Sequence, residues 1–121
     1  MLGKLSACSR LNGKLDVEVI QIAGGCTLRR NGKIVIIQFS YCKCSDWSNA
    51  SIPTNLYPII IARNTTLILS SGGTFSHFGL VAVTTVGDLS VAEYVPNSTT
   101  INELNNRDDY LIFGELSYVI S

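Results

Sequence analysis

The sequence predicts an all-β fold in which antiparallel strands form a sandwich or barrel. The dominant hydrophobic period is two: residues 15–19 alternate leucine and valine with acidic side chains, as in a strand with one solvated face. Turn signals separate the apolar runs at short intervals. No segment keeps an apolar stripe at i, i+3, i+4 and i+7 long enough for a substantial helix, so we expect none.

The first expected hairpin turns at Asn31 and Gly32. This dipeptide separates residues 27–30 from the long apolar run at residues 33–41. Asn-Gly between two β-rich runs favours a type I′ turn, in which both central residues need positive φ. We therefore expect both Asn31 and Gly32 in the centre of the turn.

The other elements follow from the same alternation and from the glycine and proline positions. In chain order, we expect strands at 56–62 and 65–69, a loop at 70–73, a second hairpin joining 78–85 to 89–94, and a polar segment at 96–109 with a short helical turn at 101–104.

Residues 110–120 form the last expected strand, with Phe113 and Val119 on one face and Leu116 and Ile120 on the other. Both faces of this run are apolar. An antiparallel sandwich usually has one polar, solvated face per strand. We therefore expect the second face to be covered as well, most economically by another copy of the chain.

Length and charge restrict the domain count and the partners. A chain of 121 residues has the size of one domain; we expect an N-terminal extension or neck at residues 1–14 and a β-sandwich domain at residues 15–121. Nine basic residues balance nine acidic ones without a basic cluster, so nucleic acid is not an expected partner. No apolar run approaches the length of about 20 residues that spans a bilayer, so no membrane insertion is expected.

The four cysteines are expected to be free and mostly buried thiols. Cys42 and Cys44 are two residues apart on a strand-like run, so their side chains share a face and do not meet each other. The spacing lacks the paired C-x-x-C of structural zinc sites. A bridge involving Cys8 or Cys26 and adventitious metal binding stay open as alternatives.

No catalytic constellation is visible, and we expect a protein that is not an enzyme and carries no cofactor. His77, the single histidine, has serines nearby but neither a nucleophile motif nor a paired carboxylate. Asp108, Asp109 and Glu103 match no calcium loop, so a solvated loop is expected there and no metal site. The glycine pairs form no phosphate-binding motif.

The polar stretch at residues 45–58 contains Trp47, the only tryptophan. Two interpretations stay open for Trp47: a ligand-contacting aromatic, or a packing anchor at a corner of the fold. Pro53 and Pro58 favour the corner, because each fixes φ and removes a backbone donor.

The order of these features resembles a known family. A hairpin leads into a long apolar strand, then a tryptophan and the segment Ile-Pro-Thr-Asn-Leu-Tyr-Pro at 52–58. A glycine-rich loop, the strand Phe-Gly-Leu-Val-Ala-Val at 78–83 and the ending Gly-Glu-Leu-Ser-Tyr-Val-Ile at 114–120 follow. Over residues 27–121 this resembles the C-terminal head domain of tail-fibre and baseplate receptor-binding proteins of phages and prophages. The cysteines, and Leu-Tyr-Pro at 56–58 where the family has tyrosine, one residue and proline, depart from the pattern.

The resemblance implies a β-sandwich of jelly-roll kind that assembles as a homotrimer. The implied function is adhesion to a host cell-surface saccharide or protein, by a protein made in the bacterial cytoplasm and located in the virion tail or fibre. Because polar loops on a rigid scaffold usually carry binding, we expect the ligand at loops 71–77 and 105–109. The candidate ligand-binding residues are Trp47, Thr74, His77, Asn105, Asn106, Asp108 and Asp109.

Two other functions stay open. One is a structural virion protein, a capsid decoration or fibre-attachment unit that binds other virion proteins. The other is a tumour-necrosis-factor-like trimeric ligand, which is less favoured because the sequence shows no secretion signal or membrane anchor.

Overall fold

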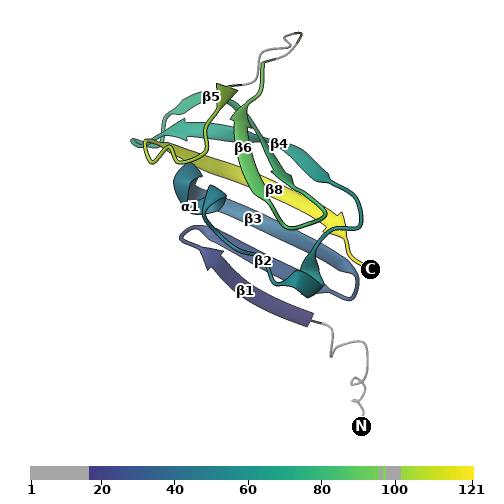
Figure 1. The fold of residues 1–121 in the computed structure, drawn as a ribbon. Helices are drawn as coiled ribbons and strands as arrows, with labels where there is room; N and C mark the ends of the chain where they lie inside the picture. Colours follow the sequence, from purple (N-terminus) through teal and green to yellow (C-terminus); the bar gives the residue numbers. More distant parts are fainter. Residues whose placement is uncertain (1–16, 96, 98–101) are drawn as a thin grey trace.

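The structure is a computed structural model and describes residues 17–95, 97 and 102–121. Its elements are β1 (Val17–Ala23), β2 (Cys26–Asn31), β3 (Ile34–Lys43), α1 (Cys44–Ser48), the 3₁₀ turn η2 (Thr54–Leu56), β4 (Ala62–Ser70), β5 (Phe75–Val83), β6 (Leu89–Glu93), β7 (Asn102–Glu103) and β8 (Tyr110–Val119). The eight strands form one antiparallel sheet in the order β1-β2-β3-β8-β4-β5-β6-β7 (Figure 1). The expected all-β antiparallel fold is confirmed.

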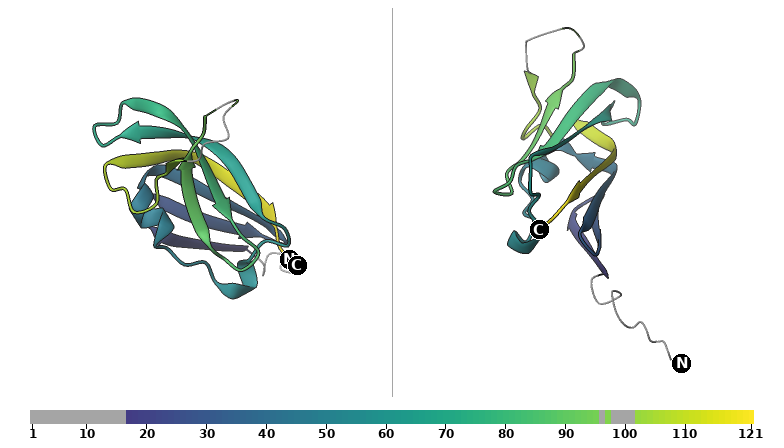
Figure 2. Two further views of the ribbon diagram at one scale, coloured as in Figure 1. Left: turned by 45° about the horizontal axis from the view of Figure 1, so that its top comes forward. Right: turned by 90° about the vertical axis from the view of Figure 1, so that its right-hand side faces the viewer.

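The sheet bends so that β6 lies across α1 from β3 (Figure 2). In Figure 2, α1 and η2 lie on the concave side of the bend, between strands β1 to β3 and strand β6. Trp47 on α1 links the two sides, because its indole Nε1 donates a hydrogen bond of 2.9 Å to the carbonyl oxygen of Ser90 on β6. This two-sided arrangement is consistent with the expected sandwich.

The core lies on the concave side, which we call the inner face. On β8 the inner face carries Ile112, Leu116 and Tyr118, whereas Phe113 and Val119 point to the opposite, outer face. The alternation predicted for this strand is therefore confirmed. The other fully buried core residues are Cys26, Leu28, Val35, Ile37, Cys42, Cys44, Trp47, Leu56, Ile68, Val81, Val83 and Val91.

The first hairpin turns one residue later than predicted. Asn31 pairs with Ile34 as the last residue pair of β2 and β3, so the two central residues are Gly32 and Lys33. Among residues 31–34, only Gly32 has a positive φ, of 64°. A positive φ at the first central residue alone fits a II′ turn, for which glycine is the preferred first residue.

Two other predicted elements are wrong. Residues 56–62 do not form a strand: apart from one bridge between Pro58 and Ile120 the segment is irregular, and β4 begins only at Ala62. A proline cannot donate to a ladder, which explains why the apolar pattern did not give a strand. The helical turn expected at 101–104 is the short strand β7 at residues 102–103, while residue 101 lies outside the described residues.

Strands β4 and β8 separate along part of their length. They pair only where residues 67–70 meet residues 110–113. Beyond this point the Asn64 side chain bridges the gap by donating to the Glu115 carbonyl at 2.6 Å. The backbone N–H of Ile59 donates to the Val119 carbonyl at 3.1 Å and closes the far end. The separation leaves an open groove between the strands.

The described cysteines agree with the prediction of free, buried thiols. Cys26, Cys42 and Cys44 are free and fully buried. Burial raises the pKa of Cys44 to about 12, and a hydrogen bond with Cys42 together with burial raises the pKa of Cys26. Cys8 and the expected N-terminal extension at residues 1–14 lie outside the described residues.

Candidate binding surfaces

Trp47 lies in the core and offers no surface to a ligand. Its exposed fraction is zero, its ring packs edge-on against Phe39 at a centroid distance of 4.9 Å, and its only polar atom bonds to Ser90. The interpretation as a packing anchor therefore holds, and the ligand-contacting interpretation of Trp47 is wrong for this conformation.

The two candidate loops meet at one end of the sheet, around Tyr110. His77 packs edge-on against the Tyr110 ring at 5.2 Å, and the Arg107 guanidinium lies over the same ring at 4.8 Å. Arg107 also forms two hydrogen bonds to the Asp109 carboxylate, of 2.9 and 2.7 Å. We call this group of His77, Arg107, Asp109 and Tyr110 the loop-end cluster.

The charges of the loop-end cluster are paired. Hydrogen bonding to Arg107 lowers the pKa of Asp109, and the same bonds raise the pKa of Arg107. Both side chains are about half exposed, so solvent screens the pair and its contribution to stability is small. The bidentate geometry instead fixes the direction of the guanidinium over the ring.

His77 lacks the partners of a general base. Its Nδ1 lies 2.9 Å from the Ser76 hydroxyl oxygen, which resembles a serine–histidine pair. Its Nε2 is buried and has no hydrogen-bond partner among the described residues, so no carboxylate orients the ring as in a catalytic triad. The geometry gives no support for hydrolytic chemistry here.

Asn105 and Asn106 serve the scaffold. The Asn105 side-chain oxygen accepts a hydrogen bond of 2.9 Å from the backbone N–H of Val91 and ties the loop to β6. Asn106 has a φ of 67°. Its side-chain oxygen accepts a hydrogen bond of 3.1 Å from the side-chain amide of Asn49, which ties the loop to the end of α1. The side-chain oxygen of each asparagine is thus used within the protein.

Thr74 and Asp108 remain exposed at the same end of the sheet. The Thr74 carbonyl accepts a hydrogen bond of 2.7 Å from Ser70 and closes the turn between β4 and β5, which leaves its side chain outside. The structure therefore keeps Thr74, His77, Asp108 and Asp109 as candidates for contact with a ligand, and adds Arg107 and Tyr110.

A row of exposed apolar side chains crosses the outer face, and the sequence reasoning did not identify it as a site. Leu67 on β4 pairs with Phe113 on β8 and with Phe78 on β5, and the Tyr94 N–H donates to the Phe78 carbonyl at 2.9 Å. Tyr41 extends the row, with its ring 5.5 Å from that of Phe113. Each of the five is 38–55% exposed. We call them the aromatic row.

Tyr41 reaches this face through a strained backbone. The pairing of β3 with β8 shifts between Ser40 and Cys42, and Tyr41 in the bulge has a φ of 55°. For a bulky residue this left-handed conformation costs about 1–3 kcal/mol. Gly25 permits the bulge, since a Cβ there would lie only 2.5 Å from the Ser40 carbonyl oxygen. Such strain is concentrated at functional surfaces, which makes the row a candidate site.

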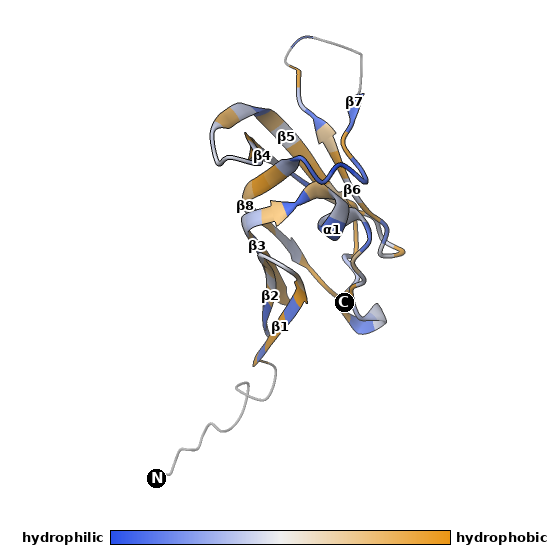
Figure 3. Ribbon diagram, turned by 90° about the vertical axis from the view of Figure 1, so that its left-hand side faces the viewer, coloured by the Kyte–Doolittle hydropathy of each residue, from blue (hydrophilic) through white to orange (hydrophobic). Residues whose placement is uncertain are grey.

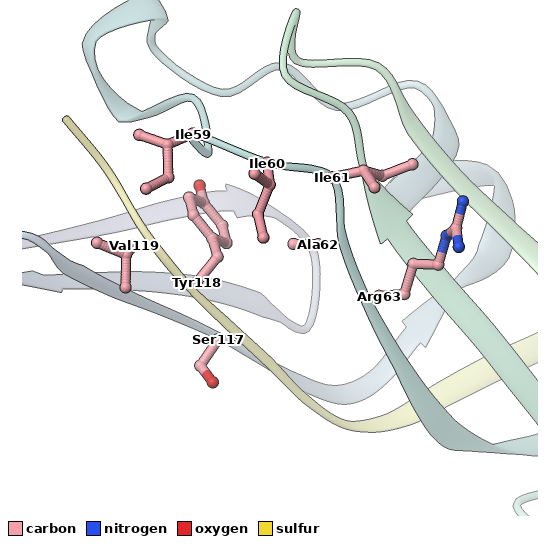
Figure 4. Close-up of a pocket in the computed structure, with 8 residues that line it drawn as sticks. All are labelled: Ile59, Ile60, Ile61, Ala62, Arg63, Ser117, Tyr118 and Val119. Carbon is pink, nitrogen blue, oxygen red and sulfur yellow. The ribbon is translucent and has the colours of Figure 1, made fainter.

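A second apolar area lies at the other end of the outer face. It consists of exposed Ile34, Ile59, Ile60, Ile61 and Val119, which we call the aliphatic patch. It borders the groove between β4 and β8, which has a volume of about 350 Å³ and is also lined by Arg63 and Ser117 (Figure 4). Figure 3 shows hydrophobic residues along β4, β5 and β8.

The signal for these surfaces was present in the sequence only as strands that are apolar on both faces. This pattern does not show which face of each strand is the inner face and which is the outer face. Among the described residues, no group of three or more metal-ligating side chains comes together. None of the helices in the same ranges is long and apolar enough to cross a membrane.

Comparisons with known proteins do not assign the chain to a family. No family model matches it, and neither the curated proteins nor the solved structures give a significant match. The resemblance to phage receptor-binding heads therefore stays a prediction.

Proposed function

We propose that the chain is a non-enzymatic binding head that assembles as a homotrimer and attaches to a saccharide or protein on a host cell surface. In this proposal it belongs to a phage or prophage tail fibre and is made in the bacterial cytoplasm. The sequence order of its elements, the all-β scaffold and the loop-end cluster support the proposal.

The observation that carries the proposal is the loop-end cluster. Two polar loops meet there on a rigid sheet, and the ion pair of Arg107 and Asp109 fixes polar groups beside the Tyr110 ring. The exposed guanidinium and carboxylate can form hydrogen bonds with the hydroxyls of a saccharide, and the aromatic ring beside them adds apolar contact.

The test is binding of the purified chain to a glycan array and to intact host cells. The double variant Arg107→Ala and Asp109→Ala is expected to bind at least about ten-fold more weakly, a change equivalent to about 1.4 kcal/mol. Asn55→Ala is the matched control, because Asn55 is an exposed polar residue on η2, outside the loop-end cluster. Wild-type protein that shows no retention on any host surface at high concentration would contradict the proposal.

A structural virion protein is the second candidate, favoured by the exposed aromatic row. Large exposed apolar patches often mark protein–protein contacts. Co-sedimentation with capsids or tails, without retention on host envelopes, is the expected result for this candidate. If the chain is retained on host envelopes and does not co-sediment with capsids or tails, the result favours the binding head over the structural virion protein.

A further inference from the structure

The outer face carries two different apolar areas at opposite ends of the same strands. The aromatic row crosses β8 at Phe113, whereas the aliphatic patch crosses it at Val119. Six residues of an extended strand separate the two by about 20 Å. Between them, Glu115 and Ser117 on β8 and Gln38 on β3 are polar, and only the half-buried Ile36, opposite Ser117, is apolar. The two areas are therefore distinct surfaces.

We propose that copies of this chain join through these two surfaces, with the aliphatic patch of one copy packed on the aromatic row of the next. The proposal rests on the homotrimer of the proposed function and names its contact. When two unlike surfaces meet, the contact is heterologous, and such contacts close into a ring if the rotation between copies allows it. A ring of three uses every patch and every row once.

Shape favours a contact between unlike surfaces. The aromatic row projects, with Tyr41 pushed outward by its bulge to an exposed fraction of 55%. The aliphatic patch borders the open groove of about 350 Å³ between β4 and β8. A ridge packs well into a groove, whereas two ridges or two grooves do not reach the packing density of a protein interior.

The exposed apolar area suits a stable interface. At 41–55% exposure, each aromatic side chain of the row leaves roughly 100 Å² in solvent, since a large aromatic carries about 150–250 Å². Row and patch together offer on the order of 800 Å² of apolar surface. A standard interface buries about 1,600 Å² in total, of which about 57% is apolar. The two surfaces thus supply the apolar part of one such contact.

Charge also favours the pairing of patch with row. Arg63 lines the groove beside the aliphatic patch, and Glu115 lies next to Phe113 along the outer face. Opposite charges therefore flank the two surfaces. With nine basic and nine acidic residues, copies of the chain carry no net charge that would oppose assembly.

The test uses one charged substitution in each surface. Ile60→Lys, at the most exposed patch residue (73% exposed), and Phe78→Lys in the row each remove one surface and keep the other. In analytical ultracentrifugation at micromolar concentration, we expect wild type to sediment as a trimer and each variant alone as a 13.1 kDa monomer. An equimolar mixture of the two variants still contains one intact pair of surfaces and should give a dimer of two chains.

The controls separate loss of contact from loss of folding. Ser51→Lys changes an exposed residue outside both surfaces and should remain a trimer. If Phe78→Lys is partly unfolded at the temperature of the measurement, Leu67→Lys replaces it as the variant of the aromatic row. Dimer formation in the mixture itself requires both variants to be folded.

Four results overturn the inference. Retention of the wild-type mass by both variants would show that neither surface is used. Dissociation by only one of the two variants would show a contact of one surface with itself. A mixture of folded variants that stays monomeric would show that patch and row do not meet. A monomeric wild type removes the trimer as well, whereas adhesion is tested separately by host-surface binding.

Discussion

At the scale of single residues, environment decided the role of each aromatic side chain. Trp47 is in a polar stretch of sequence and yet is fully buried, because its indole N–H donates a hydrogen bond to the Ser90 carbonyl and its ring packs against Phe39. Tyr41 ends an apolar run and yet is exposed, because the bulge turns it outward. Polarity of the neighbours in sequence is thus a poor guide to exposure where the chain leaves a regular strand.

Tyr118 gives a prediction for alkaline pH. Its hydroxyl donates a hydrogen bond of 2.7 Å to the Leu56 carbonyl, and burial raises its pKa from 10.0 to about 12. Because the folded state favours the neutral phenol, its contribution to stability is complete below pH 10 and is lost as the pH rises toward 12. Between pH 9 and 11.5 we expect this residue to lower the free energy of unfolding by about 2 kcal/mol.

The measurement is urea unfolding of the wild type and of Tyr118→Phe at both pH values. The variant should be less stable than wild type at pH 9 by about 1 kcal/mol, because the Leu56 carbonyl loses its donor. Its stability should also fall less between the two pH values. Equal falls in both proteins would mean that Tyr118 titrates normally.

At the scale of elements, the contact between β4 and its neighbours contains an unusual polar group. Thr66 is 4% exposed, and its hydroxyl has no hydrogen-bond partner among the described residues. Gly79 and Gly114 face it from the adjacent strands, where a Cβ would come within 3.2 Å and 3.1 Å of its side chain. Small neighbours on both sides thus make room for Thr66 directly beneath the aromatic row.

Thr66→Val is expected to stabilise the protein by about 1 kcal/mol, since it removes a buried hydroxyl without a partner and keeps the side-chain shape. Thr65→Val is the matched control: Thr65 is the exposed neighbour on β4, and its replacement should change stability by less than about 0.5 kcal/mol. Thermal unfolding of both variants measures the difference. Destabilisation by Thr66→Val alone would mean that the hydroxyl is satisfied in solution.

At the scale of the whole molecule, the bent sheet closes a core that contains three thiols. In a Cys8→Ser background, Cys26, Cys42 and Cys44 should react with Ellman's reagent only after unfolding. Burial excludes the reagent from all three thiols, and the raised pKa values of Cys26 and Cys44 also keep their thiolates scarce at neutral pH. The hydrogen bond with Cys26 lowers the pKa of Cys42, so Cys42 is protected by its burial alone.

Counting the thiols tests this directly. Unfolding without a reductant should release all three thiols. A count of one would reveal a disulfide, and rapid reaction of the native protein would show that the core opens readily.

The loop-end cluster could be predicted in part. Sequence reasoning placed a ligand at two polar loops, and the structure brings them together through His77 and Asp109. It did not identify Arg107 or Tyr110, although Arg107 lies only two residues from Asp109 and three from Tyr110. The contact that depends on the tertiary structure is the one between His77 on β5 and Tyr110 on β8. Asn105 and Asn106 stay predicted contacts, and their side-chain oxygens also hold the loop to β6 and to the end of α1.

The sequence by itself determined the all-β class, most strand positions and the two faces of β8, because a period of two and turn residues are local properties. The tertiary structure decided which face is inner, since that depends on the partner strands and on the direction of the bend. It also decided that residues 56–62 leave the sheet, where Pro58 cannot donate to a ladder. The aromatic row exists only because β3 and β8, which are distant in sequence, lie beside the hairpin of β4 and β5, so no local pattern could predict it.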